Sequence, residues 1–433
     1  MSAISAESIL EEFYGYGAPK ENYLVGGEYE RIILRPNGMS VGYEESFGIR
    51  WFLLEFAKRW DWKPKMEGNK IIALTKDGAS ITLEPGGQFE LSGAPHKSLL
   101  ALQKEFETNR TCLNTLCTQS GLHTVTVGLT PYAKIENISW MPKGRYVIMR
   151  EYLPQRGKLA HYMMKGTASV QCNYDFSNEA DCARKVALCS GIAPLTTAMY
   201  ANSPLYLGRP TGKMSYRGHI WTHTDPDRTG FPPGLRDDFS YERWVNYLLD
   251  VPMMFIQRDH WIHARGRSFR DFINHGIDGH FPTKDDWELH MTSVFPEVRI
   301  KRTIEVRGAD CVSHELALAF CALFSGLLYS DTAMDKALAL KELFCTHHDI
   351  AQRFSIACTH GLEGELGGKK LSSWAEELVD IAVSGLEEWQ PESVSLLNPL
   401  IKQVQTGESP ARTMLRNWKQ NPNPEGLIPT ISY

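Results

Sequence analysis

The chain has 433 residues, of which 42% are hydrophobic and 11% aromatic, so it can bury a substantial core. Its 46 basic and 51 acidic side chains give a formal net charge of -5, which argues against a duplex-binding surface that neutralises many phosphates. The N-terminus lacks a basic, apolar targeting segment, and the longest apolar run, residues 316–329, is shorter than the roughly 20 residues that span a bilayer. We expect a cytoplasmic globular protein that binds neither nucleic acid nor membrane.

The nine cysteines do not have the regular spacing of a disulfide framework, so reduced thiols are expected. The sequence shows no internal repeat, no low-complexity tract and no linker-like stretch that would mark a boundary. One domain covering residues 1–433 is therefore the simplest prediction.

The N-terminal part of the chain contains two predicted strands that carry carboxylates. Glu28 and Glu30 are two residues apart and would project from one face of a strand. In residues 82–92 the polar side chains occupy even-numbered positions, as on one face of a strand, although Pro-Gly-Gly must turn or bulge within the run. This segment predicts a glycine-interrupted strand that holds Glu84 and Glu90 near one face.

Two later segments alternate in the same way. Residues 167–176 place apolar side chains on one face and polar side chains, including Gln171 and Asn173, on the other. Residues 298–307 alternate Val and Ile with five polar side chains, Arg299, Lys301, Thr303, Glu305 and Arg307. Both segments predict strands with one polar face.

Helical patterns lie between and after these strands. Residues 177–201 begin with Ser177 as a candidate N-cap, residues 373–376 form a capping-box pattern, and Pro410 suits a first helical position. The last third, from about residue 313, has mostly helical patterns. The fold class expected is α+β, with an antiparallel sheet whose apolar face is covered by helices.

Paired carboxylates and nearby cations at strand spacing are the groups that phosphoryl transfer from ATP to a carboxylate requires. Carboxylates hold Mg²⁺ on the phosphates, and Lys or Arg neutralises the transferring group. The same spacing also occurs on ordinary solvated faces of antiparallel sheets, so the pattern alone leaves both interpretations open.

A series of colinear motifs is more specific. The chain contains LEPGGQFELSGAP (residues 83–95), MPKGRY (141–146), MREYLP (149–154), GTASVQ (166–171), ANSP (201–204), HIW (219–221), DVPM (250–253), FPEVR (295–299) and EVRGAD (305–310). In this order they resemble the plant-type glutamate–cysteine ligases, a family found in plants and many proteobacteria, and the likeness runs from about Glu28 to the C-terminus.

The resemblance implies a glutamine synthetase-like ligase fold, a curved antiparallel sheet that binds ATP, Mg²⁺ and L-glutamate. It implies a γ-glutamyl phosphate intermediate and attack by the amine of L-cysteine, the first step of glutathione biosynthesis. Small molecules would be its partners, and a monomer or homodimer is expected.

The resemblance also implies roles for particular residues. Mg²⁺ and phosphate would be held by Glu28, Glu30, Glu84, Glu90 and Glu305. The nucleotide would be bordered by Gln171, Asn173, Lys301 and Arg302. Substrate binding would fall to Arg217, which clamps a glutamate carboxylate, and to Trp221, Tyr152 and Arg150. The expected catalytic residues are Glu84, Glu305, Arg307 and Lys301.

The chain departs from the family pattern at two places. His223 stands where the family usually has Asp, and residues 311–314, CVSH, replace the usual Gly-Gly-Pro-Trp. Two alternatives therefore stay open: a γ-glutamyl ligase of another amine, or a non-catalytic relative that binds nucleotide or amino acid.

Overall fold

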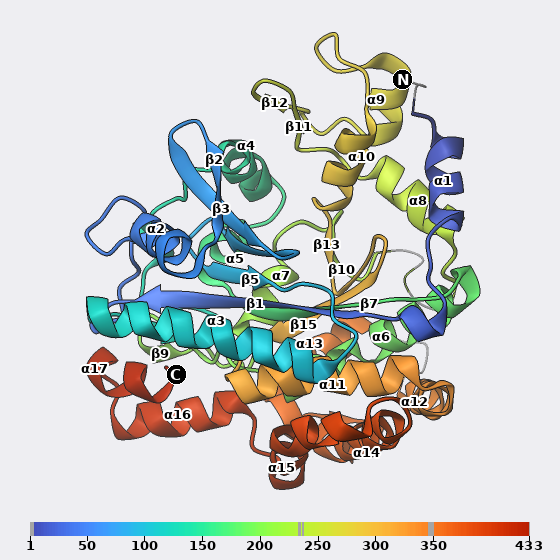
Figure 1. Cartoon of the computed structure of the whole chain (residues 1–433). Helices are drawn as coiled ribbons and strands as arrows, with labels where there is room; N and C mark the ends of the chain where they lie inside the picture. The colour runs from blue at the N-terminus through green and yellow to red at the C-terminus, as the bar shows by residue number, and fades with distance from the viewer. Residues whose placement is uncertain (1–3, 233–234, 236–237, 345–349, 433) are drawn as a thin grey trace.

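The computed structural model describes residues 4–232, 235, 238–344 and 350–432. Helices and short strand pairs surround one large sheet (Figure 1). Among these residues nine strands form the sheet. They are β1 (Val25–Leu34), β2 (Lys63–Glu67), β3 (Lys70–Lys76), β4 (Ala79–Leu83), β5 (Phe89–Ser92), β6 (His123–Val125), β7 (Ser169–Tyr174), β14 (Val298–Ile300) and β15 (Ile304–Asp310). Their order is β14-β15-β7-β1-β5-β4-β3-β2, with β6 also paired to β1 and every pairing antiparallel.

The other described strands form short pairs. These are β8 (Leu205–Tyr206) with β9 (Arg209–Pro210), β10 (Thr229–Gly230) with β13 (Phe295–Pro296), β11 (Phe255–Gln257) with β12 (Trp261–His263), and β16 (Glu365–Leu366) with β17 (Lys369–Lys370).

Two of the predicted single strands are hairpins. Within residues 82–92 the chain reverses after β4, where Glu84 N–H donates to Gln88 O (3.0 Å) and Gly87 has φ 91°. Within residues 298–307 it reverses between β14 and β15. Directly paired residues of a hairpin share a face, so the grouping of side chains is confirmed. The reversal within residues 82–92 falls at the Pro-Gly-Gly where a turn or bulge is expected, whereas the single strand over residues 298–307 is wrong.

Helices make up most of the remaining structure. They are α1 (Ala6–Tyr14), α2 (Ile49–Trp60), α3 (Leu99–Ser120), α4 (Gly144–Tyr152), α5 (Ala160–Gly166), α6 (Glu179–Met199), α7 (Tyr216–Trp221), α8 (Tyr241–Asp250), α9 (Phe269–His275), α10 (Lys284–Met291), α11 (His314–Tyr329), α12 (Asp331–Phe344), α13 (Ile350–His360), α14 (Leu371–Trp389), α15 (Asn398–Thr406), α16 (Pro410–Gln420) and α17 (Pro424–Leu427). The largely helical final third is confirmed.

The predicted helix starts have mixed outcomes. Pro410 is the first residue of α16, as expected. The N-cap of α6 is Asn178 rather than Ser177, because the Asn178 side chain accepts from Asp181 N–H. The capping box at Ser373 is wrong, since α14 starts directly after β17 and already includes that residue.

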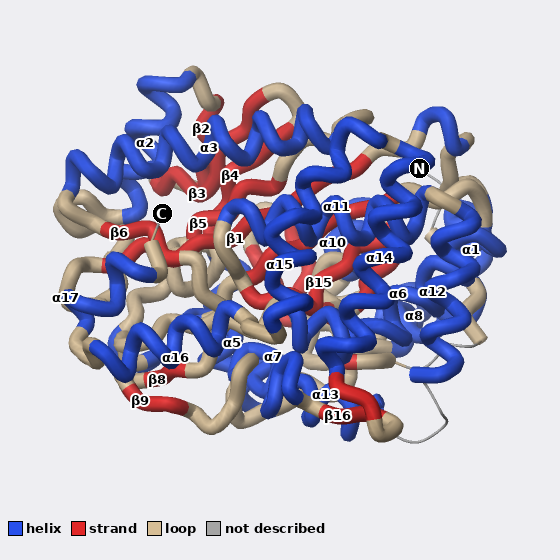
Figure 2. The backbone as a smooth tube through the Cα atoms, turned by 90° about the horizontal axis from the view of Figure 1, so that it is seen from below, coloured by secondary structure: helices blue, strands red, loops and turns tan. Residues whose placement is uncertain are grey.

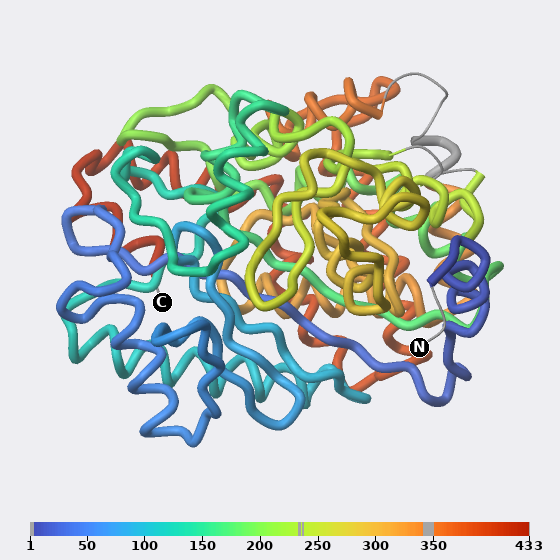
Figure 3. The backbone as a smooth tube through the Cα atoms, turned by 90° about the horizontal axis from the view of Figure 1, so that it is seen from above, coloured from blue at the N-terminus to red at the C-terminus, as the bar shows by residue number. Residues whose placement is uncertain are grey.

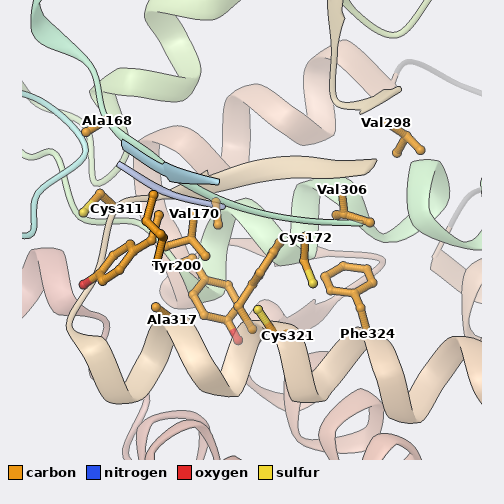
Figure 4. Close-up of a cluster of buried hydrophobic side chains, with 14 of the residues drawn as sticks. Ala168, Val170, Cys172, Tyr200, Val298, Val306, Cys311, Ala317, Cys321 and Phe324 are labelled. Carbon is orange, nitrogen blue, oxygen red and sulfur yellow. The ribbon is translucent and has the colours of Figure 1, made fainter. Parts of the chain in front are cut away.

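The apolar face of the sheet packs on helices. From β7 and β15, Val170, Cys172 and Val306 meet the side of α11 that carries Cys321 and Phe324, and all five are buried (Figure 4). Helix α6 packs on β15, and α3 packs on β1. From below, helices cover this side of the molecule (Figure 2). The α+β class with helices against an antiparallel sheet is confirmed.

Shorter segments lie over the opposite, polar face. From above, the green and yellow middle part of the chain lies nearest the viewer (Figure 3). It includes α4, α5, α7 and the β11–β12 hairpin, which supply side chains to a cavity above the sheet. The two faces of the sheet therefore serve different purposes, one for the core and one for a cavity.

Two further properties concern membranes and thiols. Within the part of the chain that is described, no single helix is long and apolar enough to cross a membrane, and α11 with α12 passes that test only as a pair bent by 100°. The eight described cysteines are free and buried.

Candidate active site

A cavity of ≈ 320 Å³ lies on the polar face of the sheet, a volume within the usual range for small-molecule sites. Its floor consists of side chains from six neighbouring strands and the loop after β14, namely Glu28, Glu30, Thr82, Glu90, Ser92, Gln171, Arg299, Lys301 and Arg307. Its roof includes Lys143, Arg145, Tyr146, Met149, Met163, Met164, Trp221, Met254 and Phe255. The charged floor thus faces a mostly apolar roof that also carries two cations, Lys143 and Arg145, and its apolar part suits a planar base or a substrate side chain.

Three floor carboxylates lie close together without a cation of their own. Glu30 is directly opposite Glu90 across β1 and β5, a like-charge pairing that is normally destabilising. Burial and the neighbouring Glu305 and Glu90 raise the pKa of Glu28 to about 7. Burial and the Glu90 and Glu84 charges raise the pKa of Glu30 to about 8. No salt bridge in the described chain involves Glu28, Glu30 or Glu90, so this carboxylate cluster would become more readily ionised if a cation bound in the cavity.

Hydrogen bonds fix two of these carboxylates in place. Glu30 accepts from Ser169 N–H (2.6 Å) and from Gln171 Nε2 (3.2 Å), and Glu28 accepts from Asn173 Nδ2 (2.8 Å). Gln171 and Asn173 both come from β7, which pairs with β1. Both side chains lie on the polar face that the alternation of residues 167–176 predicts, and the structure places them beside the carboxylates.

Glu305 has the opposite surroundings. It is fully buried, and its two oxygens accept from Arg299 Nε (2.9 Å) and Nη2 (2.8 Å). Lys301 Nζ lies 3.2 Å away, and Arg307 also pairs with it. Burial alone would raise the pKa of Glu305, but the three cations hold it well below its usual range. In this structure Glu305 orients the cations of the cavity and does not line it.

The turn that carries Glu84 is anchored to α5. A Cβ at Gly86 would lie 2.2 Å from Lys165 O, so only glycine allows this approach. The Gln88 side chain donates to Thr167 O (2.7 Å) and accepts from Gly86 N–H (2.9 Å). This anchoring holds Glu84 at the edge of the cavity, where it is a lining residue.

Arg217 and Trp221 lie at the side of the cavity formed by α7. Arg217 is only 4% exposed, donates to Arg307 O (3.1 Å) and lies 5.5 Å from the Trp221 ring. Its Nε is buried without a hydrogen-bond partner. Trp221 lines the cavity, and Arg217 lies behind it.

Three predicted substrate or nucleotide residues lie elsewhere. Tyr152 packs over Arg228, 5.5 Å from its guanidinium carbon. Arg150 is exposed in a surface groove that shares Lys143 and Tyr146 with the cavity, but it does not line the cavity itself. Arg302 is 65% exposed and pairs with Glu12 and Glu288. The roles given to these residues stay predictions, without support from the cavity geometry.

Four charged residues near the cavity were not predicted. Lys143 and Arg145 line its roof and Arg299 its floor, and each lies within a motif that the sequence displays. Glu297 is buried with Oε2 lacking a partner, and burial raises its pKa to about 7 against the charges of Arg217 and Arg307. For all four, the available signal was position within MPKGRY or FPEVR.

The carboxylate cluster suits Mg²⁺ only together with another ligand. Among the residues that the structure describes, no three His, Cys, Asp or Glu side chains are arranged to hold a metal ion. Mg²⁺ commonly binds one or two carboxylates together with substrate phosphates. The raised pKa values show carboxylates that a divalent cation would stabilise, so the residues fit a phosphate-bound Mg²⁺.

A model of the glutamate–cysteine ligase family 2 matches residues 24–428. The chain belongs to this family. It is 38% identical over 415 residues to the chloroplastic glutamate–cysteine ligase of Brassica juncea, covering 94% of this chain and 80% of the relative. It is 39% identical over 406 residues to the enzyme of Nicotiana tabacum, covering 92% and 76%.

Solved structures of ligases share the fold. The glutamate–cysteine ligase of Francisella tularensis in complex with AMP matches with a TM-score of 0.58 at 13% identity, covering 96% of this chain and 89% of that one. A bifunctional glutathione synthetase from Pasteurella multocida matches with a TM-score of 0.55 at 14% identity, covering 98% and 53%. These matches confirm the glutamine synthetase-like fold expected for the family.

The two departures from the family pattern lie outside the cavity lining. The His223 side chain is exposed and packs on His219 in a tilted arrangement, with ring centroids 4.3 Å apart. Cys311 is buried, and His314 is 3.2 Å from Glu107 of α3, on the helical side of the sheet. Neither departure changes a side chain that lines the cavity.

Proposed function

We propose that the protein is an ATP-dependent ligase that joins the γ-carboxylate of L-glutamate to the amine of L-cysteine. The observation that carries this proposal is the cavity in which unpaired carboxylates face Arg299, Lys301 and Arg307, in a chain of the glutamate–cysteine ligase family. The names of the relatives, glutamate–cysteine ligase, support the choice of substrates.

The reaction would proceed in two balanced steps. A γ-carboxylate oxygen of glutamate bonds to the γ-phosphorus of ATP, and the bond to the ADP oxygen breaks. The cysteine nitrogen then bonds to the acyl carbon of γ-glutamyl phosphate, phosphate leaves, and the amine loses a proton. The products are γ-glutamylcysteine, ADP, phosphate and a proton.

The residues of this chain would act by positioning and charge neutralisation, the main requirements of phosphoryl transfer. Arg307 and Lys301, both oriented by Glu305, would stabilise the transferring phosphoryl group. Arg217 would bind a glutamate carboxylate beside Trp221. The methionine-rich roof would exclude water from the acyl phosphate.

We propose Mg²⁺ as the metal, held by Glu28, Glu30, Glu84 and Glu90 together with the phosphates. When bound, Mg²⁺ would supply positive charge that neutralises the phosphate groups. A thermal-shift assay tests this: Mg²⁺ with ADP should raise Tm by at least about 2 °C more than Mg²⁺ alone. An equal rise with Mg²⁺ alone would contradict a phosphate-dependent site.

The function is tested with purified protein, Mg²⁺–ATP, L-glutamate and a panel of amines. We expect ADP release that requires glutamate and an amine, and mass spectrometry should identify γ-glutamylcysteine as the main product. If another γ-glutamyl compound is the main product, the amine that it contains is the acceptor in place of cysteine. Nucleotide binding without product for any amine would favour a non-catalytic relative.

We also propose that residues 1–433 form one catalytic ligase domain, as the single large cluster of core side chains from Ile9 to Ile431 supports. Limited proteolysis should then yield no stable fragment. A monomer or homodimer in the cytoplasm stays our prediction, to be checked by sedimentation and cell fractionation.

A further inference from the structure

A three-way junction next to the cavity roof is not explained by the proposed chemistry. Glu67, the last residue of β2, accepts two hydrogen bonds on the same oxygen, Oε1. The donors are Gly144 N–H at the start of α4 (2.9 Å) and the Trp261 indole Nε1 of β12 (3.0 Å). One oxygen thus joins three segments that are far apart in the sequence (Figure 1).

The junction is packed so closely that it depends on glycine. A Cβ at Gly144 would lie 2.4 Å from Trp261 Cδ1 and 2.6 Å from Glu67 Oε1. Real Cβ atoms essentially never make contacts this short, so a side chain at residue 144 would displace the Trp261 ring or the Glu67 carboxylate, which are hydrogen-bonded to each other. The sequence MPKGRY therefore supplies its glycine where the Glu67 carboxylate and the Trp261 ring meet the helix.

The junction leads directly to both halves of the cavity roof. Gly144 separates Lys143 and Arg145, two cations that line the cavity. On the other side, the Trp261 ring packs edge-to-face on Phe255 with centroids 5.1 Å apart, and Phe255 also lines the cavity. Moving Glu67 Oε1 would release α4 and the β11–β12 hairpin from each other.

We propose that Glu67 is a positioning residue that fixes Lys143 and Arg145 over the phosphates of bound ATP. Both cations line the same cavity as Glu84 and Glu90, two of the proposed Mg²⁺–phosphate carboxylates, and Lys143 Nζ donates to the carbonyl oxygen of Leu83 (2.7 Å), the residue before Glu84. Arg217, the proposed glutamate contact, lies instead at the α7 side. The assignment to ATP rests on the proposed function, whereas the junction itself is independent of it.

The test compares Glu67→Ala with Glu67→Gln in the full chain. Alanine removes the acceptor that both donors share, so we expect KM for ATP to rise about 5–20-fold while KM for glutamate changes less than about 2-fold. Glutamine keeps an Oε1 acceptor and should restore near-native values. Trp261→Phe, which removes one donor and keeps an aromatic ring, should give an intermediate rise.

A matched control is Glu44→Ala, which removes an exposed carboxylate that pairs with Lys70 of the neighbouring β3 and does not line the cavity. It should leave both KM values unchanged. If Glu67→Gln fails as badly as Glu67→Ala, or if the two KM values rise equally, a role in placing the roof cations for ATP is overturned.

A second measurement does not require activity. Amide hydrogen exchange of a peptide that includes Gly144 should become faster in Glu67→Ala and remain native in Glu67→Gln. Unchanged exchange in Glu67→Ala would overturn the junction. The two proposals can fail separately. If exchange is faster in Glu67→Ala but the native protein makes no γ-glutamyl product, the junction is supported and the proposed function is overturned.

Discussion

Glu30 and Glu305 lie on the same polar face of one sheet, yet their surroundings are opposite. Glu305 is paired with Arg299, Lys301 and Arg307, which hold its pKa well below the usual range. Glu30 faces Glu90, and burial together with like charge raises its pKa to about 8. The difference separates a carboxylate that organises cations from one that needs a cation to be supplied.

This contrast changes how the carboxylates of the site should be interpreted. Residue type and parity place Glu28, Glu30, Glu90 and Glu305 in one set, and the resemblance makes all of them metal or phosphate ligands. The contacts instead divide them, because Glu305 already has three cationic partners. The following experiments would break or sharpen that division.

The largest effect is expected for Glu305→Ala. It leaves Arg299 and Arg307 buried without their carboxylate, and breaking a buried pair of this kind costs about 3–5 kcal/mol. Urea unfolding should show this loss, and turnover should fall below detection. Native stability with reduced Mg²⁺ affinity would instead make Glu305 a ligand like Glu30.

The next largest effect is expected for Glu30→Gln. Because the amide cannot supply negative charge to Mg²⁺, turnover should fall at least about 100-fold, as is common when a metal contact is lost. In contrast with Glu305→Ala, the free energy of unfolding of the metal-free protein should not decrease at neutral pH. A loss of more than about 2 kcal/mol would show that Glu30 has a structural role.

Arg217→Ala should act mainly on glutamate. Loss of a charged hydrogen bond worth about 1.5–3 kcal/mol should raise KM for glutamate about 10–100-fold. KM for ATP should change much less, since the carboxylate cluster is left intact. Arg217→Lys serves as the control that keeps the charge, and an equal rise in both KM values would contradict the assignment.

The pH dependence of stability offers a smaller effect with a definite sign. In the metal-free protein the raised pKa of Glu30 keeps its side chain protonated at pH values where the unfolded chain has already ionised. Its contribution to the free energy of unfolding is therefore fully present below pH 4.5 and is lost as the pH rises to about 8. As the pH rises from 5 to 8, the free energy of unfolding should fall less for Glu30→Gln than for the native protein, and the two decreases should differ by at least about 1 kcal/mol. Equal slopes in urea titrations would contradict the raised pKa.

The smallest effect is expected for His223→Asp, which restores the usual residue of the family. The His223 side chain is exposed and does not line the cavity, so KM for cysteine should change less than about 2-fold. A larger change would mean that the acceptor contacts α7 beyond the cavity. The same variant tested across the amine panel would then show which amine is preferred.

Much of the sheet could be predicted from alternation, since an apolar face against helices requires period 2. The hairpin within residues 298–307 could not, because paired residues of a hairpin share a face and period 2 continues through the reversal. Residues 301–303 also lack the Gly or Pro that usually marks a turn. The alternation therefore predicted which side chains share a face of the sheet, but not how the backbone connects them.

The site could be predicted where its side chains are close together in the sequence on one strand, as Glu28 and Glu30 are on β1. Lys143 and Arg145 could not be found in this way, because a distant junction at Glu67 brings the start of α4 to the cavity. The balance of charge at Glu305 also depends on the register between β14 and β15, which spacing does not reveal.

The buried cysteines have a consequence for a protein that would handle thiols. Burial raises the pKa of Cys112 and Cys117 to about 11 and that of Cys189 to about 12, so these side chains are almost entirely uncharged at neutral pH. Disulfide exchange requires an accessible thiolate. The described thiols should therefore resist forming mixed disulfides with free cysteine or its γ-glutamyl derivative, even when both are abundant around the enzyme.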